Sequence, residues 1–236
     1  MNGDAARKTS LPPPRRPVLL LVLGVALAAG MAWAFGWIAS ESMAGRLVST
    51  ADEAVAAWFR VQETPGLTAV MQLVTGLGSM AWVTGITLIA ALGLVWKRRW
   101  YGLLALGLAV PGGMALNVFL KTLFHRPRPV PELWAQIFSG YGFPSGHTMA
   151  ATLLYGALAV LACGAINRGR GRMGACVGAG ALVGLVGWSR LQLGAHFLSD
   201  VIGAVAAGLA WLGLCFAAAD ILRRCRVRPP LPPSPR

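Results

Sequence analysis

Residues 196–222 read HFLSDVIGAVAAGLAWLGLCFAAADIL, and Arg223 and Arg224 follow directly. A run of about 20 predominantly apolar residues is long enough to cross a bilayer as a helix. Ionisable residues are costly there and are usually functional, so His196 and Asp200 at one end of this run predict a functional site. Comparable runs recur along the 236-residue chain, in which 56% of the residues are hydrophobic and 12% are charged. This pattern excludes a soluble globular protein and predicts a polytopic membrane protein of the all-α class.

Six transmembrane helices are predicted, approximately at residues 18–39, 66–96, 101–120, 146–166, 173–190 and 196–222. The first is interpreted as an uncleaved anchor, because its apolar stretch is long for a signal peptide. The second ends at Trp96, while its start falls anywhere between Gly66 and Met80. Pro111-Gly112-Gly113 predicts a kink or a close helix contact, and five glycines between Gly174 and Gly187 predict tight packing of the fifth helix.

The segments outside these spans are short. Residues 1–16 and 223–236 are predicted to be disordered cytoplasmic tails, the second one basic and proline-rich, and residues 17–222 to form one membrane domain. Residues 52–61 can form a short helix with Val55, Trp58 and Phe59 on one face. That helix either lies in the membrane interface or simply connects two spans.

The net charge of +13 is unevenly distributed along the chain. Fifteen of the 21 Lys and Arg residues lie in the two tails and in loops at 97–99 and 168–172, which share one side of the membrane if the chain crosses it six times. Since cytoplasmic segments are enriched in Lys and Arg, both termini are predicted to be cytoplasmic, in the inner or plasma membrane. The surplus therefore indicates topology and not nucleic-acid binding. The cysteine positions fit neither a disulfide framework nor a metal site.

Pro144-Ser145-Gly146-His147 opens the fourth predicted span. Ser145 is a favoured N-cap residue, and the free N–H groups at the start of a helix attract anions such as phosphate. Gly146 lets a ligand approach the backbone closely, and His147 falls in the first turn beside it. Taken alone, the segment is explained equally well by a capped helix with an interfacial histidine.

His196 and Asp200 are four residues apart, so on a helix they share one face. A carboxylate that accepts from one ring nitrogen fixes the tautomer and leaves the other nitrogen free to attack, although such a pair is often only a satisfied polar contact. Lys121, Arg128 and Arg190 can bind phosphate oxygens, and each alone could instead extend toward lipid headgroups. Together, on one side of the membrane, these residues predict a phosphoryl-transfer site.

The segments Lys121-x6-Arg128-Pro129, Pro144-Ser145-Gly146-His147 and Ser189-Arg190-x5-His196-x3-Asp200 resemble the three-part signature of the type 2 phosphatidic acid phosphatase superfamily. Every position of that signature is matched. The resemblance implies that His196 is the nucleophile and forms a phosphohistidine, that Asp200 orients it, and that His147 protonates the leaving oxygen. It also implies that no metal or other cofactor is needed. The residues implied to bind the phosphoryl oxygens are Lys121, Arg128, Ser145, Gly146 and Arg190. His125, between matched positions, is interpreted as a rim or structural residue.

The resemblance predicts an enzyme that removes a phosphate or diphosphate group from a bacterial membrane lipid at the periplasmic or extracytoplasmic face. Undecaprenyl diphosphate and phosphatidylglycerophosphate are the favoured substrates, with phosphatidate and a lipid A phosphate as further alternatives. One alternative is a phosphotransferase that passes the phosphoryl group to a second lipid. Another is a non-catalytic protein that binds or transports lipid phosphates, although the intact His196, Asp200 and His147 argue against it. A vanadate-dependent haloperoxidase shares the constellation by resemblance but should be soluble.

Overall fold

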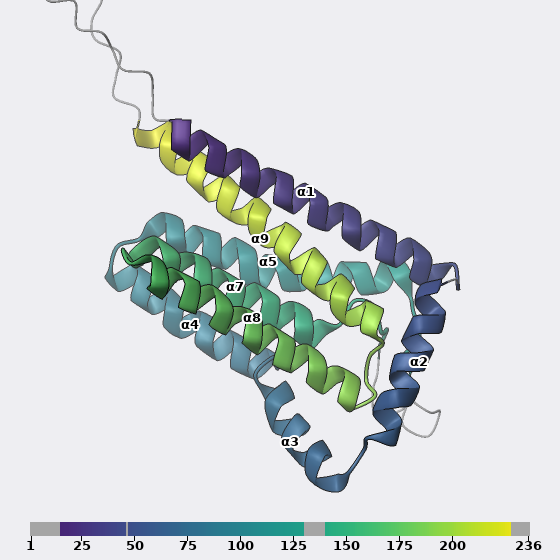
Figure 1. Ribbon diagram of the computed structural model, residues 1–236. Helices are drawn as coiled ribbons and strands as arrows, with labels where there is room; N and C mark the ends of the chain where they lie inside the picture. The colour runs from purple at the N-terminus through teal and green to yellow at the C-terminus, as the bar shows by residue number, and fades with distance from the viewer. Residues whose placement is uncertain (1–14, 46, 130–139, 228–236) are drawn as a thin grey trace, which may run out of the picture.

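The computed structural model describes residues 15–45, 47–129 and 140–227, and its regular elements there are all helices (Figure 1). The helices are α1 (Arg15–Met43), α2 (Leu47–Val61), α3 (Pro65–Gly76), α4 (Met80–Trp96), α5 (Trp100–Phe124), α7 (Gly146–Ala165), α8 (Gly169–Gln192) and α9 (Leu198–Val227). The predicted all-α class is confirmed.

Five segments of the described chain are long and apolar enough to cross a membrane: Pro65–Trp96, Trp100–Phe124, Gly146–Ala165, Gly169–Gln192 and Leu198–Cys225. The first predicted span corresponds to α1, which is not among these five. With 29 residues, α1 is about 44 Å long at 1.5 Å per residue, so its length alone permits a crossing. The prediction of a polytopic membrane protein is thus confirmed. If the chain crosses the membrane a sixth time, α1 is the helix that does so.

Large apolar side chains cover the outside of the bundle, as expected of helices that face lipid. Among those that are exposed are Leu88, Ile89, Leu92, Val118, Phe119, Val177, Leu185 and Leu214. The core gathers around α7, whose Met149, Leu153 and Leu154 are fully buried against residues of α5, α8 and α9. Because α7 begins at Gly146, the most enclosed helix of the bundle carries the predicted phosphate-binding segment at its start.

The first and last helices lie side by side and antiparallel, so the start of α1 and the end of α9 come together at one end of the bundle (Figure 1). A β-carbon built on Gly213 of α9 would lie only 2.8 Å from Cβ of Ala28 in α1, which shows how closely small residues let these helices approach. The end of α8 and the start of α9, which carry Arg190 and Asp200, lie at the opposite end.

The second predicted span divides into two helices, α3 and α4, at Leu77–Ser79. The Ser79 hydroxyl accepts from the N–H of Trp82 and so starts α4. Gly78 lies in this turn, and a β-carbon there would be 2.7 Å from the carbonyl oxygen of His147. Only a glycine lets the turn approach the start of α7 so closely.

Several local predictions need correction. Helix α9 continues five residues past the expected end at Leu222, since Arg223 and Arg224 pair with Asp220 one turn earlier and stabilise the last turns. Helix α1 already begins at Arg15, and the rest of the predicted tails, 1–14 and 228–236, lies outside the described residues. The prediction of tight helix packing is wrong for four of the five glycines from Gly174 to Gly187 in α8. A β-carbon at Gly174, Gly178, Gly180 or Gly184 would meet no other described atom within 4 Å.

The close contact expected at Pro111-Gly112-Gly113 is confirmed, because a β-carbon on Gly113 would lie 2.5 Å from Leu153 of α7 and 3.0 Å from Trp211 of α9. The short helix expected at residues 52–61 also forms, as the second half of α2. Its Val55 and Phe59 pack against Leu191 and Val201, so α2 rests on the ends of α8 and α9.

Candidate active site

The three sequence segments meet at the end of the bundle opposite the start of α1 and the end of α9. Lys121 lies in the last turn of α5, and Arg128 follows that helix; the Lys121 ammonium donates to the carbonyl of Tyr141 (2.7 Å) and Arg128 Nε to that of Gly140 (3.1 Å). A β-carbon built on Gly146 would lie 3.9 Å from Cε of Lys121, which places this cation beside the start of α7. His147 interacts electrostatically with Arg190, His196, Arg128 and Lys121. The structure thus brings the predicted groups together.

Ser145 occupies the N-cap position of α7 but does not cap the helix with its side chain. Its hydroxyl instead lies 3.0 Å from Oγ1 of Thr148, and its own N–H donates to the carbonyl of Asp200 (3.1 Å). This backbone bond fixes the start of α7 against the start of α9. Without a side-chain cap, the N–H groups of the first turn of α7 stay available to another acceptor.

Arg190 is buried near the end of α8. Its Nη1 donates to the hydroxyl of Thr75 in α3 (2.9 Å), while its buried Nε has no partner among the described residues. A buried guanidinium N–H without an acceptor costs free energy, and an anionic ligand at this point would satisfy it.

His196 precedes α9, with Nδ1 at 3.5 Å from Oδ2 of Asp200. The distance exceeds that of a good hydrogen bond, but catalytic contacts are often long before substrate binds. Burial lowers the pKa of His196 to about 4, an effect that Asp200 opposes and that Arg190 and Arg128 reinforce. The ring is therefore neutral near pH 7, and the nitrogen that does not face Asp200 carries a free electron pair.

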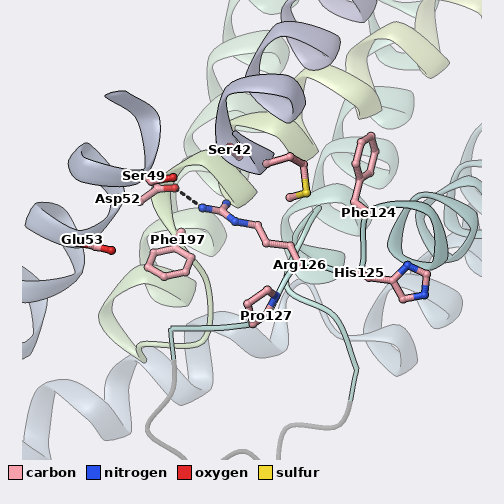
Figure 2. Close-up of a pocket in the computed structure, with 10 residues that line it drawn as sticks. Ser42, Ser49, Asp52, Glu53, Phe124, His125, Arg126, Pro127 and Phe197 are labelled. Carbon is pink, nitrogen blue, oxygen red and sulfur yellow. Dashed lines mark hydrogen bonds and ion pairs between the residues drawn. The ribbon is translucent and has the colours of Figure 1, made fainter. Parts of the chain in front are cut away.

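The sequence motifs predicted no role for Arg126, yet this residue is buried and contacts Asp200. Its Nη1 donates to Oδ1 of Asp200 (2.7 Å) and to the hydroxyl of Ser199 (2.6 Å), and its Nη2 donates to Oδ2 of Asp52 in α2 (2.7 Å). Figure 2 shows Arg126 reaching from the loop after α5 toward Asp52. One signal was present in the sequence: Asp52 shares a helical face with Val55 and Phe59, and a carboxylate on a buried face requires a partner.

His125, next to Arg126, ends α5 in the left-handed conformation (φ 49°) and is exposed, with its ring against Tyr141. This placement agrees with a rim or structural role.

A cavity of about 490 Å³ adjoins the site on the side of α2 and α3. Arg190 lines it, together with Phe59 of α2, Gln72 and Thr75 of α3, and Gln192. Gln192 is buried, and its Nε2 has no partner among the described residues. The cavity therefore offers both an apolar wall and polar groups next to a phosphate-binding cation.

A membrane helix bundle with two histidines, an aspartate and several cations at one end has the parts of a membrane phosphatase that acts on lipids. Residues 100–224 match the family model of the PAP2 superfamily, and the chain belongs to this superfamily. The resemblance inferred from the motifs is thereby confirmed.

A protein sequence and a solved structure from Bacillus subtilis are similar to this chain. Phosphatidylglycerophosphatase B of strain 168 is 32% identical over 183 residues, which cover 76% of this chain and 88% of the relative. The crystal structure of a transmembrane PAP2-type phosphatidylglycerolphosphate phosphatase matches with a TM-score of 0.72 and 29% identity, over 85% of this chain and 98% of that one. The predicted enzyme class is confirmed: this chain is a multi-pass membrane phosphatase that hydrolyses a phosphate ester of a lipid.

Proposed function

We propose that this enzyme removes the terminal phosphate of phosphatidylglycerophosphate through a phosphohistidine on His196, without a metal ion. The observation that carries the mechanism is the environment of His196. The Nδ1 atom of His196 faces Asp200. The three cations Lys121, Arg128 and Arg190 lie close enough to one another and to His147 to interact electrostatically. The sequence match and the structure match both carry the name of a phosphatidylglycerophosphate phosphatase, which supports this lipid over phosphatidate or undecaprenyl diphosphate.

In the first step, Nε2 of His196 attacks phosphorus while the P–O bond to the lipid breaks and His147 gives its proton to the leaving oxygen. Asp200 stabilises the positive charge that develops on the His196 ring. In the second step, water attacks the phosphohistidine, its proton passes to His147, and the N–P bond breaks to release phosphate. The three cations, with the Ser145 hydroxyl and the backbone N–H groups at the start of α7 from Gly146 on, balance the charge on the phosphoryl oxygens that a metal ion balances in other phosphatases.

The remainder of the substrate is proposed to occupy the cavity beside Arg190. Phosphatidylglycerophosphate has a glycerol and a phosphodiester between its terminal phosphate and its acyl chains, and such a headgroup needs hydrogen-bond partners beyond the phosphate site. Gln72, Thr75 and Gln192 supply them. Phosphatidate has no such spacer, so it would leave these groups unpaired at a cost in affinity.

The substrate and the metal-free reaction are tested together with detergent-purified enzyme in EDTA. Phosphatidylglycerophosphate, phosphatidate and undecaprenyl diphosphate are supplied separately, and free phosphate is followed over time. We expect the highest kcat/KM for phosphatidylglycerophosphate and no effect of EDTA. Activity that is lost in EDTA and restored by magnesium would contradict the metal-free mechanism, and appearance of the phosphate on a second lipid would indicate a phosphotransferase.

The active site is proposed to lie on the extracytoplasmic side, with both termini in the cytoplasm, because the basic loops at 97–99 and 168–172, the start of α1 and the end of α9 lie at the other end of the bundle. In a variant without the four native cysteines, a Ser139→Cys substitution should react with an impermeant thiol reagent in intact cells. Reaction only after permeabilisation would reverse the orientation.

A further inference from the structure

Behind the catalytic Asp200 lies a buried ionic network that connects three parts of the chain. Arg126 comes from the loop after α5, Asp52 from α2, and Ser199 and Asp200 from the first turn of α9. Arg126 and Asp52 are 7% and 2% exposed, and Asp200 is fully buried. Charges so far from water are costly, and these persist because each is paired and hydrogen-bonded.

We propose that Arg126 and Asp52 are positioning residues of the phosphatase: Arg126 holds Asp200 in the orientation that faces His196, and Asp52 holds and balances Arg126. The proposal rests on the phosphohistidine mechanism proposed above. Neither residue contacts the phosphate in this account.

The orientation of Asp200 follows from the bonds to its two carboxylate oxygens. Oδ1 accepts from Nη1 of Arg126 (2.7 Å), while Oδ2 accepts from the N–H of Phe197 (2.9 Å) and faces Nδ1 of His196. With both oxygens held, the carboxylate cannot rotate about its last bond. Without Arg126, only the Phe197 N–H would restrain that rotation, and Oδ2 would be less well aimed at His196.

The charge balance explains why a second carboxylate is needed. An arginine paired with Asp200 alone would neutralise it and weaken its attraction for the positive charge that forms on His196. Asp52 pairs with the other side of the same guanidinium, at 2.7 Å. Asp52, Arg126 and Asp200 together therefore carry one net negative charge, which remains available to stabilise His196 in the transition state.

Asp52 also ties α2 to the helix that carries Asp200. Its Oδ1 accepts from the backbone N–H of Ser199 (2.8 Å), and its Oδ2 accepts from the Ser199 hydroxyl. A carboxylate that accepts from a first-turn N–H is favourable at the start of a helix. The Arg126 guanidinium, 4.8 Å from the centre of the Phe197 ring, packs against the same turn. Helix α2, predicted as an interfacial or connecting helix, thus forms part of the frame of the site.

The test separates positioning from phosphate binding. Arg126→Lys and Asp52→Asn are compared with the wild type for kcat and for the inhibition constant of inorganic phosphate. We expect kcat to fall by about 10- to 100-fold, as for other outer-shell partners of catalytic groups, while the inhibition constant changes by no more than about threefold. Glu53→Gln, next to Asp52 but exposed, and Arg170→Lys, at the far end of α8, are the matched controls and should retain the wild-type kcat.

A rescue experiment tests the same role without relying on loss of activity. A cavity of about 300 Å³ lies against Arg126, between the end of α1, α2 and Phe197 (Figure 2). Removing the side chain in Arg126→Ala joins its space to this cavity, so a guanidinium ion can enter. Added guanidinium chloride should raise kcat of Arg126→Ala by about tenfold or more, and should not raise that of the wild type or of Arg126→Met, whose side chain fills the space.

Two outcomes would overturn the proposal. One is a wild-type kcat in both Arg126→Lys and Asp52→Asn. The other is a loss of kcat matched by an equal weakening of phosphate inhibition, with no rescue of Arg126→Ala, which indicates general collapse of the site. These results differ from failure of the proposed mechanism itself, which would appear as turnover by His196→Gln at the wild-type rate.

Discussion

The site has two sides that use their cations differently. On the phosphate side (Lys121, Arg128, Ser145, Gly146 and Arg190), Lys121 and Arg190 donate to neutral oxygens, and within the described residues neither has a carboxylate partner. On the support side (Asp52, Arg126, Ser199 and Asp200), Arg126 pairs with two carboxylates. A cation without a carboxylate partner can pair with an anionic ligand, whereas a cation that is paired with two carboxylates stabilises the structure. Chemically similar side chains thus take different roles because of their partners.

The largest effect should come from the phosphate side. Arg190→Met removes a buried guanidinium that we propose binds the transferred phosphoryl group, and we expect kcat/KM to fall by about 10²- to 10³-fold. Unlike Arg126→Lys, this variant should also weaken inhibition by inorganic phosphate at least tenfold, to about the extent that one lost charge-assisted contact implies. Unchanged phosphate inhibition in Arg190→Met would remove the distinction between the two sides.

His147→Ala should depend on the leaving group. A lipid alkoxide needs a proton as it departs, so we expect a loss of about 10²-fold with phosphatidylglycerophosphate. A substrate with a good leaving group, such as p-nitrophenyl phosphate, should lose much less in its phosphorylation step. The burst phase of p-nitrophenol release and of lipid product release reports the phosphorylation step before the phosphoenzyme is hydrolysed, and equal losses in that phase for both substrates would count against the general-acid role.

Packing around the phosphate side can be tested at Gly78. A β-carbon there would lie 2.7 Å from the carbonyl oxygen of His147, so Gly78→Ala must displace the start of α7 or the turn before α4. We expect the free energy of unfolding to fall by about 1–3 kcal/mol, the usual range for overpacking, with a several-fold loss of activity. Gly76→Ala is the control, because a β-carbon at Gly76 meets no described atom within 4 Å. Thermal unfolding in detergent compares the two, and equal melting temperatures would contradict this packing.

The smallest predicted effect concerns the pH at which His196 gains a proton. Because burial lowers its pKa to about 4, the ring should stay neutral as pH falls through 6.5 and should gain its proton only near pH 4. Its nucleophilic form is therefore present above about pH 4 and lost below it. The chain has three histidines, so ¹⁵N signals can be assigned with single His→Gln variants. A titration midpoint near 6.5 would show that the site is wetter than the structure describes.

Much of this arrangement could be predicted from the sequence. The start of α7 at Gly146 was predicted, and so was the end of α4 at Trp96, because caps, glycines and charged loops mark helix ends locally. The residues of the phosphate side were also identified, since each belongs to a short motif. Their assignment to roles remains a prediction.

The support side could not be predicted in the same way. Arg126 is 74 residues from Asp200, and Ser199 is 147 residues from Asp52, so no local spacing connects them. The break between α3 and α4 was missed for a similar reason: Leu77–Ser79 is apolar enough for a helix, and the contact of Gly78 with α7 appears only once the bundle has formed. Contacts between distant segments depend on how the helices pack in the folded bundle, and local patterns in a single sequence do not reveal that packing.

The central claim is that His196 carries the phosphoryl group, and trapping the intermediate tests it most directly. With p-nitrophenyl phosphate labelled on phosphorus, His147→Ala should form the phosphoenzyme readily but hydrolyse it slowly, because the same histidine activates water in the second step. After an alkaline quench, we predict protein-bound label that is stable to base, labile to acid and located on His196, and its absence in the His147→Ala, His196→Gln double variant. Label on another residue, or equal labelling of the double variant, would contradict the account.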